Sequence, residues 1–232
     1  MLNGITADFS PGTAVALIGA NGAGKSTLIK CLVRLIEPDA GQICVLGHDV
    51  SMMTGAALRQ IRSRVGIVWQ KHNLVPRVSA LTNVLHGMQS RLSGPGTWWQ
   101  AIASARARAE ALTCLEAVGL SGVATQRADQ LSGGQSQRVA LARVLMQKPS
   151  IILADEPDAS LDPQAGDDVM RLLASLARSQ KLTLIFVSHR LQHALEHADR
   201  IIGLSKGRIL LDVPAAQAEA SDLRRFFGER RP

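Results

Sequence analysis

Tyrosine is absent from the sequence, and aromatic residues make up only 3% of its 232 residues. Proteins that hold single-stranded nucleic acid stack the bases on aromatic side chains, so this shortage argues against a nucleic-acid partner. The net charge of +7 then favours another anionic partner, either a nucleotide phosphate or the anionic surface of a membrane.

Cysteines and long apolar runs are scarce as well. The three cysteines, Cys31, Cys44 and Cys114, are widely spaced and form no Cys-x-x-Cys motif, which favours reduced cytosolic thiols over a disulfide framework or a zinc site. Apolar runs such as Ala14–Ile18 and residues 182–187 are far too short to cross a bilayer. The N-terminus has no basic flank followed by an apolar core, so we expect no export signal.

What the sequence does contain is a set of short aliphatic segments, several of them apolar on both faces, as the buried strands of a parallel sheet are. The predicted strands are Ala14–Ile18, 66–69, 151–154, Thr183–Val187, 201–204 and 208–211. Helical patterns at residues 25–36, 164–180 and Leu191–His197 separate them. This alternation predicts a layered α/β core.

The pattern changes between residues 72 and 147, where strand-like segments disappear and helical periodicity takes over at residues 103–118 and 135–147. We therefore expect one domain over residues 1–232. Its α/β core comprises residues 1–71 and 148–214, its helical subdomain residues 72–147, and its polar, arginine-rich C-terminal tail residues 215–232.

A glycine-rich segment follows the first predicted strand and precedes an apolar helix, in the pattern G-x-x-x-x-G-K-[ST]. Glycines allow consecutive backbone N–H groups to surround an anion, and the positive end of the helix points to the same place. Lys25 supplies a charge for the β and γ phosphates, and the Ser26 hydroxyl can bind Mg²⁺. The predicted triphosphate-binding residues are Gly19, Asn21, Gly22, Ala23, Gly24, Lys25, Ser26 and Thr27.

Two acids, Asp155 and Glu156, follow the predicted strand at residues 151–154. Asp155 at the strand end can reach the Mg²⁺ held by Ser26, and Glu156 can act as the general base for an attacking water. An ordinary acidic turn is the alternative interpretation, and the nearby phosphate loop favours the catalytic one.

A second candidate anion site begins the helix at residues 135–147. Ser132 is a good N-cap, and Gly133 and Gly134 expose backbone N–H groups at the positive end of that helix, just before Gln135. This site has no lysine and belongs to another element than the phosphate loop. Taken alone, the segment could equally be a capped surface helix.

Together these motifs resemble those of ABC transporter ATPase domains, in the same order and over nearly the whole chain. The resemblance implies a P-loop NTPase (RecA-like) core with an inserted α-helical subdomain and a small N-terminal antiparallel β part. Residues 1–5 are similar to the family's second strand. The resemblance therefore includes no counterpart of the first strand, which carries the adenine-stacking aromatic residue. By the same resemblance, Gln70 contacts the Mg²⁺ or the attacking water, His189 contacts the γ-phosphate, and Asp162 lies at a dimer seam.

The resemblance also implies ATP and Mg²⁺ as cofactors and a homodimer in which Ser132, Gly133, Gly134 and Gln135 of one copy cover ATP bound to the other. The expected partners are an integral-membrane permease and a periplasmic solute-binding protein, with the chain peripheral at the cytoplasmic face of the inner membrane. Another importer, an export or mechanical system, or a soluble cofactor-assembly ATPase stays open as an alternative.

Several segments are similar to phosphonate-importer ATPases in particular, namely residues 73–87, Thr97-Trp98, 126–130, 153–162 and 198–204. Residues 187–190 (Val-Ser-His-Arg) depart from the Asn-Leu-His-Gln that is usual there. Trp98 and Trp99 could either face the permease or pack inside the helical subdomain.

Overall fold

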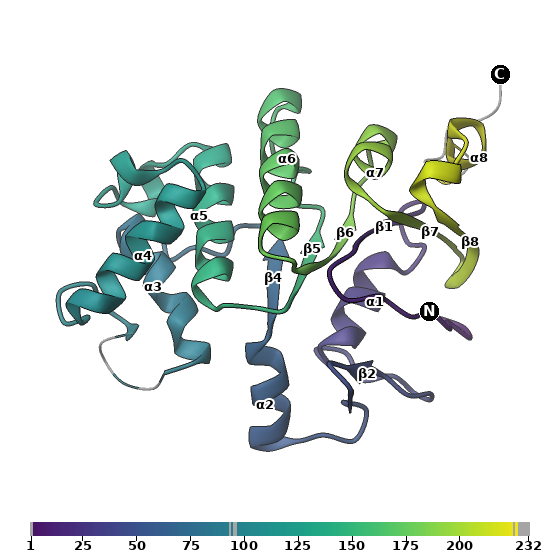
Figure 1. The fold of residues 1–232 in the computed structure, drawn as a ribbon, viewed down its shortest axis with the longest axis horizontal. Helices are drawn as coiled ribbons and strands as arrows, with labels where there is room; N and C mark the ends of the chain where they lie inside the picture. The colour runs from purple at the N-terminus through teal and green to yellow at the C-terminus, as the bar shows by residue number, and fades with distance from the viewer. Residues whose placement is uncertain (1, 93, 95–96, 225, 227–232) are drawn as a thin grey trace.

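The computed structural model describes residues 2–92, 94, 97–224 and 226, which form a central sheet with helices on both faces (Figure 1). The sheet has six strands in the order β4-β5-β6-β1-β7-β8. All neighbours pair in parallel except β7 and β8, which are antiparallel. Its strands are β1 (Ala14–Ile18), β4 (Val65–Trp69), β5 (Ile151–Asp155), β6 (Thr183–Val187), β7 (Arg200–Ser205) and β8 (Arg208–Pro214).

The six predicted strands are confirmed, with ends that differ by three residues at most. Alternate residues of each central strand point into different cores, since Ala16 and Phe186 belong to one buried cluster while Val15 and Ile185 belong to the other. Because β1 and β6 are buried along their whole length, they show no alternation of polar and apolar residues.

Helices cover both faces of the sheet, with α6 and α7 on one face and α1 and α2 on the other (Figure 1). The α-helices are α1 (Lys25–Leu32), α2 (Gly55–Ser63), α3 (Ala80–Leu85), α4 (Ala105–Ala117), α5 (Gly133–Met146), α6 (Pro163–Ser179), α7 (Leu191–His197) and α8 (Ala220–Arg224). Short 3-10 helices are η1 (His86–Ser90), η3 (Ser121–Val123), η4 (Ala128–Gln130) and η5 (Ala215–Gln217). Among the described residues no helix combines the length and apolar character needed to cross a membrane.

The helix predicted at residues 25–36 is shorter in the structure, because α1 ends at Leu32. Arg34 adopts a left-handed φ of 52°, and the Leu35 N–H donates back to the Lys30 carbonyl at 2.9 Å, as in a Schellman-like helix end. Leu35 is consequently 54% exposed, although its apolar character had favoured a buried helical position.

A two-stranded antiparallel sheet, β2 (Cys44–Val45) and β3 (His48–Asp49), forms the small β part of the fold. The expected strand at residues 1–5 is wrong for the described residues 2–5. Gly4 has a φ of 63°, which interrupts an extended conformation, and among residues 2–5 the Asn3 N–H donates to the Gly207 carbonyl at 2.8 Å.

Between β4 and β5, helices α3, α4 and α5 pack on one another at one end of the molecule (Figure 1). Helix α5 also packs on β4 and α6, so the helical segment is continuous with the core. Trp98 and Trp99 are 59% and 62% exposed, which excludes the interpretation that they pack inside this subdomain.

The C-terminal segment contributes apolar side chains to the core, although its composition is polar. Leu223 of α8 and Phe226 are buried in the larger core cluster. Most of the arginine-rich end, residues 225 and 227–232, lies outside the described residues.

The contact between η1 and α5 gives a test of this packing. A Cβ at Gly87 would lie 2.1 Å from the Arg143 carbonyl oxygen and 3.0 Å from the Met146 Cβ. Gly87→Ala should therefore push η1 away from α5 and lower the free energy of unfolding by about 1–3 kcal/mol. Denaturant unfolding measures the change.

Gly122→Ala is the matched control, because a Cβ there meets no heavy atom within 4 Å. Its free energy of unfolding should stay within about 0.5 kcal/mol of the parent protein. Equal stability of the two variants would contradict the close approach of η1 to α5.

Candidate functional site

The phosphate loop connects β1 to α1, and its backbone is shaped by glycines. A Cβ at Gly19 would lie 2.4 Å from the Leu204 carbonyl oxygen, so the loop can pass this close to β7 only without a side chain. Gly24 is the N-cap of α1 with a left-handed φ of 108°, which other residues rarely adopt. The loop therefore curls at the positive end of α1, where an anion is favoured.

Lys25 reaches back over this loop. Its Nζ donates to the Gly19 carbonyl at 2.7 Å and to the Ala20 carbonyl at 3.0 Å, and the side chain is 5% exposed. Burial lowers the pKa of Lys25, and the nearby carboxylates of Glu156 and Asp155 partly oppose that shift. The ammonium group is thus held at the mouth of the loop, within the field of two acids.

Ser26 and Asp155 join the phosphate loop to the end of β5. The Ser26 Oγ donates to the Asp155 Oδ1 at 2.8 Å, and the carboxylate is 8% exposed. Burial raises the pKa of Asp155, while the hydrogen bond from Ser26 opposes the shift. A hydroxyl and a buried carboxylate at this distance are the oxygen ligands that Mg²⁺ prefers, so the residues present fit the ion.

Glu156 and His189 form a second polar pair, at the ends of β5 and β6. The His189 Nε2 and the Glu156 Oε1 lie 2.6 Å apart, with the histidine more exposed than the acid. Glu156 has a φ of 52°, which is uncommon for a residue with a Cβ and turns its side chain out of the strand direction. Such outliers concentrate at functional sites, which supports a chemical role for Glu156.

Gln70 follows β4 directly and is exposed. Since Trp69 pairs with Asp155 in the sheet, Gln70 lies one residue beyond the acid on the neighbouring strand. Within the described part of the chain no hydrogen bond joins Gln70 to Asp155 or Ser26, and Gln70 lines a cavity of about 440 Å³ that also borders Ser136 and Ser160. Its predicted metal contact stays a prediction.

The second anion site is built as the sequence predicts. The Ser132 Oγ accepts from the Gln135 N–H at 3.2 Å, and the Gln135 Oε1 accepts from the Ser132 N–H at 3.0 Å, which makes a complete capping box at the start of α5. Ser132 and Gly133 are exposed. The capping box uses the N–H groups of Ser132 and Gln135, so those of Gly133 and Gly134 are the ones that this helix start can offer to an anion.

This second site lies beside the loop before α6, not beside the phosphate loop of the same chain. A Cβ on Gly133 would contact Leu161, and one on Gly134 would contact Ala165. Asp162 caps α6, because its carboxylate accepts from the Ala165 N–H at 3.0 Å. Among the described residues, no hydrogen bond or ion pair joins the start of α5 to the start of α1.

One residue that the sequence reasoning missed is Gln137, which is fully buried on α5. Its side-chain nitrogen donates to the Trp69 carbonyl at 3.3 Å, and its oxygen lies 2.5 Å from the His72 Nδ1. These contacts attach the segment around Gln70 to α5. A polar residue on the apolar face of the predicted helix was the available signal.

A cluster around His193 was missed as well. His193 on α7 lies between Asp158 and Asp167 and is 2% exposed. His193, Asp158 and Asp167 share no sequence motif and come together only in the folded chain, so no local pattern predicts their contact.

Comparison with known proteins identifies relatives of this site and fold. Residues 2–159 match the family described as ABC transporter. The chain is 42% identical to the phosphonates import ATP-binding protein PhnC of Alcaligenes faecalis over 229 residues, covering 98% of this chain and 82% of that protein. It is 44% identical to the phosphate-import ATP-binding protein PhnC of Mycolicibacterium smegmatis over 232 residues, covering 100% of this chain and 88% of that protein.

Solved structures give the same answer. The dimeric ATP-binding cassette MJ0796, in a post-hydrolysis state bound to ADP and Pi, aligns with a TM-score of 0.81 and 32% identity over 92% of this chain and 90% of that one. The cassette cbiO1 of Clostridium perfringens, part of the transporter complex cbiONQ, aligns with a TM-score of 0.82 and 26% identity over 97% and 86%. The sheet order, the phosphate loop and the family match lead to one conclusion: the chain belongs to the ABC transporter family, as one of its ATP-hydrolysing cassettes.

Proposed function

We propose that this ATPase drives the uptake of phosphonate, or of a related oxyanion such as phosphate, through separate permease subunits. The observation that carries the proposal is the identity of 42% and 44% to two import cassettes named for phosphonates and phosphate, over nearly the whole chain. The proposed partners are a second copy of the chain, an integral-membrane permease and a periplasmic solute-binding protein, with the chain peripheral at the cytoplasmic face of the inner membrane.

Different residues of the phosphate loop are proposed to bind different parts of Mg-ATP. Backbone N–H groups between Gly19 and Thr27 surround the phosphates, and the Lys25 Nζ neutralises the β and γ groups. Ser26, Asp155 and Gln70 would hold Mg²⁺, which supplies charge neutralisation at the phosphate oxygens when it is bound. The Ser26–Asp155 contact of 2.8 Å supports this assignment.

Glu156 is proposed to accept the proton of the attacking water. Its carboxylate lies one residue beyond Asp155 and contacts the His189 Nε2 at 2.6 Å. His189 would hold the carboxylate in position and contact the γ-phosphate. A general base must lie within hydrogen-bond reach of the proton it removes, and the end of β5 places Glu156 beside the phosphate loop.

The phosphate loop and the start of α5 are separate within one chain. A dimer in which each copy covers the ATP of the other accounts for this separation. Ser132, Gly133, Gly134 and Gln135 of one protomer would close on the γ-phosphate bound by its partner, with Asp162 at the seam. The N–H groups of Gly133 and Gly134, which lie outside the capping box, would stabilise charge as an arginine finger does. The dimeric form of the similar cassette MJ0796 supports this arrangement.

Replacing the proposed base tests the catalytic assignment. Glu156→Gln should still bind ATP, lose hydrolysis by a factor of about 10²–10⁴, and accumulate as an ATP-bound dimer. Phosphate release and analytical ultracentrifugation measure the two effects. Turnover equal to that of the parent protein would remove Glu156 from the role of base.

Two further variants serve as controls for Glu156→Gln. Lys25→Ala should lose nucleotide binding itself, which separates a defect in binding from one in chemistry. Glu196→Gln is the matched amide substitution. The Glu196 carboxylate accepts a hydrogen bond from Gln192 on the surface of α7, and this variant should hydrolyse ATP at the parent rate.

A bulky residue at the second anion site tests the shared active site. Ser132→Arg should leave ATP binding intact and prevent the ATP-dependent dimer that Glu156→Gln otherwise accumulates, because the side chain blocks the approach of the partner. Sedimentation of the double variant measures dimerisation.

Ser104→Arg is the control, since Ser104 caps α4 in the same manner and its side chain accepts from the Ala107 N–H at 3.1 Å. This variant likewise loses an N-cap and gains an arginine, but at the start of α4 instead of α5. Dimerisation blocked equally by both variants would show that helix capping, not the proposed interface, explains the effect.

The transport assignment is tested in the assembled transporter. Purification of the chain from membranes should bring with it an integral-membrane permease, and phosphonate or phosphate presented by a solute-binding protein should raise ATP hydrolysis. Sulfate serves as the control oxyanion. Recovery with cytosolic partners alone would contradict import and favour a soluble ATPase role.

A further inference from the structure

A cluster of four charged or titratable side chains, two of them buried, lies on the segments that follow Glu156 and His189. His193 is at its centre, with its Nδ1 3.2 Å from the Asp158 Oδ2 and its Nε2 2.8 Å from the Asp167 Oδ1. Arg190 completes the cluster, since its guanidinium donates to the Asp167 Oδ1 at 2.5 Å. We call these four residues the His193 clamp.

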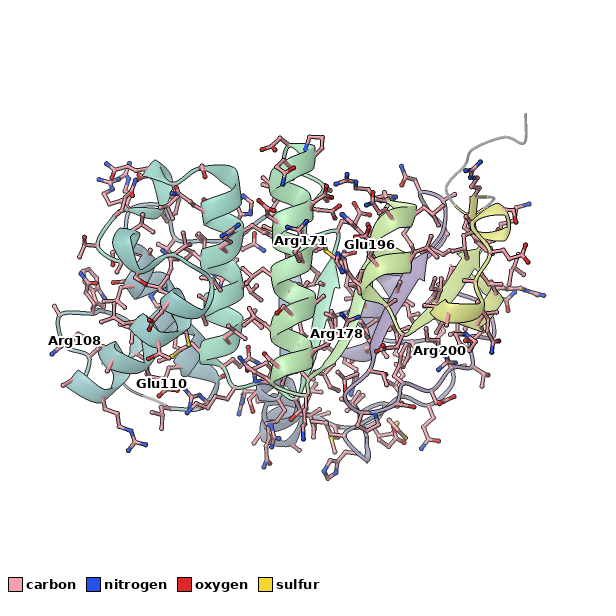
Figure 2. All side chains as sticks on the ribbon, turned by 45° about the horizontal axis from the view of Figure 1, so that its top comes forward. Arg108, Glu110, Arg171, Arg178, Glu196 and Arg200 are labelled. Atoms are coloured by element: carbon pink, nitrogen blue, oxygen red, sulfur yellow. The ribbon has the colours of Figure 1, made fainter. Side chains whose placement is uncertain are left out.

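The members of the His193 clamp come from three elements that carry the proposed chemistry. Asp158 lies two residues after Glu156 in the loop between β5 and α6. Arg190 follows His189 directly and is the N-cap of α7, while Asp167 is on α6 and His193 on α7. Figure 2 shows these two helices side by side. The clamp therefore ties the loop of the proposed base to the loop of the proposed phosphate-contacting histidine.

Further contacts tighten the same junction. Arg190 also donates to the Pro163 carbonyl at 3.1 Å, at the start of α6. The Ser188 Oγ lies 3.1 Å from the His193 Nδ1 and accepts from the Arg190 N–H at 3.1 Å. A Cβ at Gly166 would lie 3.2 Å from the Asp158 Cβ, so α6 approaches the loop closely at this point.

The direct contact between Glu156 and His189 is more exposed than the His193–Asp158 contact at the centre of the clamp, although the outer members Arg190 and Asp167 are 36% and 31% exposed. The side chains of Glu156 and His189 are 20% and 39% exposed, whereas those of His193 and Asp158 are 2% and 8% exposed. A single hydrogen bond between partly exposed side chains leaves the relative position of two loops poorly fixed. The buried His193 and Asp158 hold it more firmly, because a charge contact is stronger where water is excluded.

We infer that His193 is a positioning residue for ATP hydrolysis, which fixes the Glu156 loop relative to the His189 loop through Asp158, Asp167 and Arg190. This inference rests on the proposed roles of Glu156 and His189. The clamp includes no residue of the phosphate loop, so we expect it to act mainly on turnover, with little effect on the affinity for ATP.

The protonation state of His193 follows from its neighbours. The Nε2 is hydrogen-bonded to Asp167, and the Nδ1 lies near both the Ser188 hydroxyl and the Asp158 carboxylate, so the imidazolium form suits the two carboxylates. Burial lowers the pKa of His193, but the hydrogen bonds to Asp158 and Asp167 outweigh burial and leave the pKa above its usual value, against a smaller opposing effect of Arg190. The hydrogen bond from His193 is likewise the largest cause that lowers the pKa of Asp167.

The other titratable groups near His193 do not replace its charge. His197, one turn further along α7 with its ring centre 5.9 Å away, has a pKa lowered by burial and then by the charge of His193. Glu196, Arg171 and Arg178 act on His197 and complete the charged surroundings on α6 and α7 (Figure 2).

Turnover of matched variants tests the clamp. His193→Ala should lower kcat for ATP hydrolysis by about tenfold, while the dissociation constant for ATP changes by less than about twofold. His197→Ala removes the other buried histidine of α7 and should keep the parent kcat. Equal losses in the two variants would show that helix packing alone matters, and a parent kcat for His193→Ala would overturn the inference.

Adjacent aspartates on α6 provide a second comparison that requires no large change in the interior. Asp167→Asn removes the charge that faces His193, whereas Asp168→Asn alters a carboxylate that pairs with Arg171 on the surface. Asp167→Asn should lower kcat and Asp168→Asn should not. The inference fails if the two variants have the same kcat.

The pH dependence separates positioning from a structural role. Because the folded pKa of His193 is raised, the clamp is complete at low pH and loses one donor as pH rises through that pKa, so kcat of the parent protein should fall there. His193→Gln, which carries no titrating ring, should have a reduced kcat without this alkaline decline. An identical alkaline decline in both proteins would overturn the inference.

Glu156→Gln, run in the same series, keeps the two proposals distinct. If Glu156→Gln hydrolyses ATP normally, the proposed catalytic role fails. If Glu156→Gln is inactive and His193→Ala is not impaired, the positioning role alone fails.

Discussion

The parallel pairing of β4, β5, β6 and β1 determines where the polar groups of the site lie. Trp69 pairs with Asp155, Asp155 with Val187, and Val187 with Leu17, so these four strands end at nearly the same level. Their interiors are buried on both faces and cannot hold unpaired charge. Polar residues are consequently confined to the strand ends, where the segments with Gln70, Glu156, His189 and Gly19 converge.

The electrostatics of this edge explain why it suits a triphosphate with a divalent cation. Lys25 has a lowered pKa and Asp155 a raised one, and burial is the largest cause of both shifts. Each group thus bears a desolvation cost in its charged form. Phosphate oxygens stabilise the charged lysine, and a cation stabilises the charged aspartate, so binding both together compensates the two costs at once. This complementarity supports the proposed use of Mg²⁺ with ATP.

The strand positions and the phosphate loop were predictable because both are local patterns: runs such as Thr183–Val187, and a glycine spacing that leads into α1. The end of α1 was not, because the left-handed Arg34 has no glycine signal. The His193 clamp was beyond local reasoning for another reason. Asp158 and His193 are far apart in the sequence, and only the position of α7 beside the loop before α6 brings their side chains together. The metal contact of Gln70, taken from resemblance, stays a prediction.

The loop from Asp155 to Asp162 connects the proposed base, which acts on the ATP of its own protomer, to the tip of α5, which acts on the ATP of the partner. At its start it carries the proposed base, and near its end Leu161 lies against Gly133 at the tip of α5. In the proposed dimer, that tip covers ATP bound to the partner. A displacement of this loop after hydrolysis would therefore reach the other nucleotide through the same protomer. Because the His193 clamp holds the loop at Asp158, between these two contacts, its stiffness would influence both the chemistry at one ATP and the closure over the other.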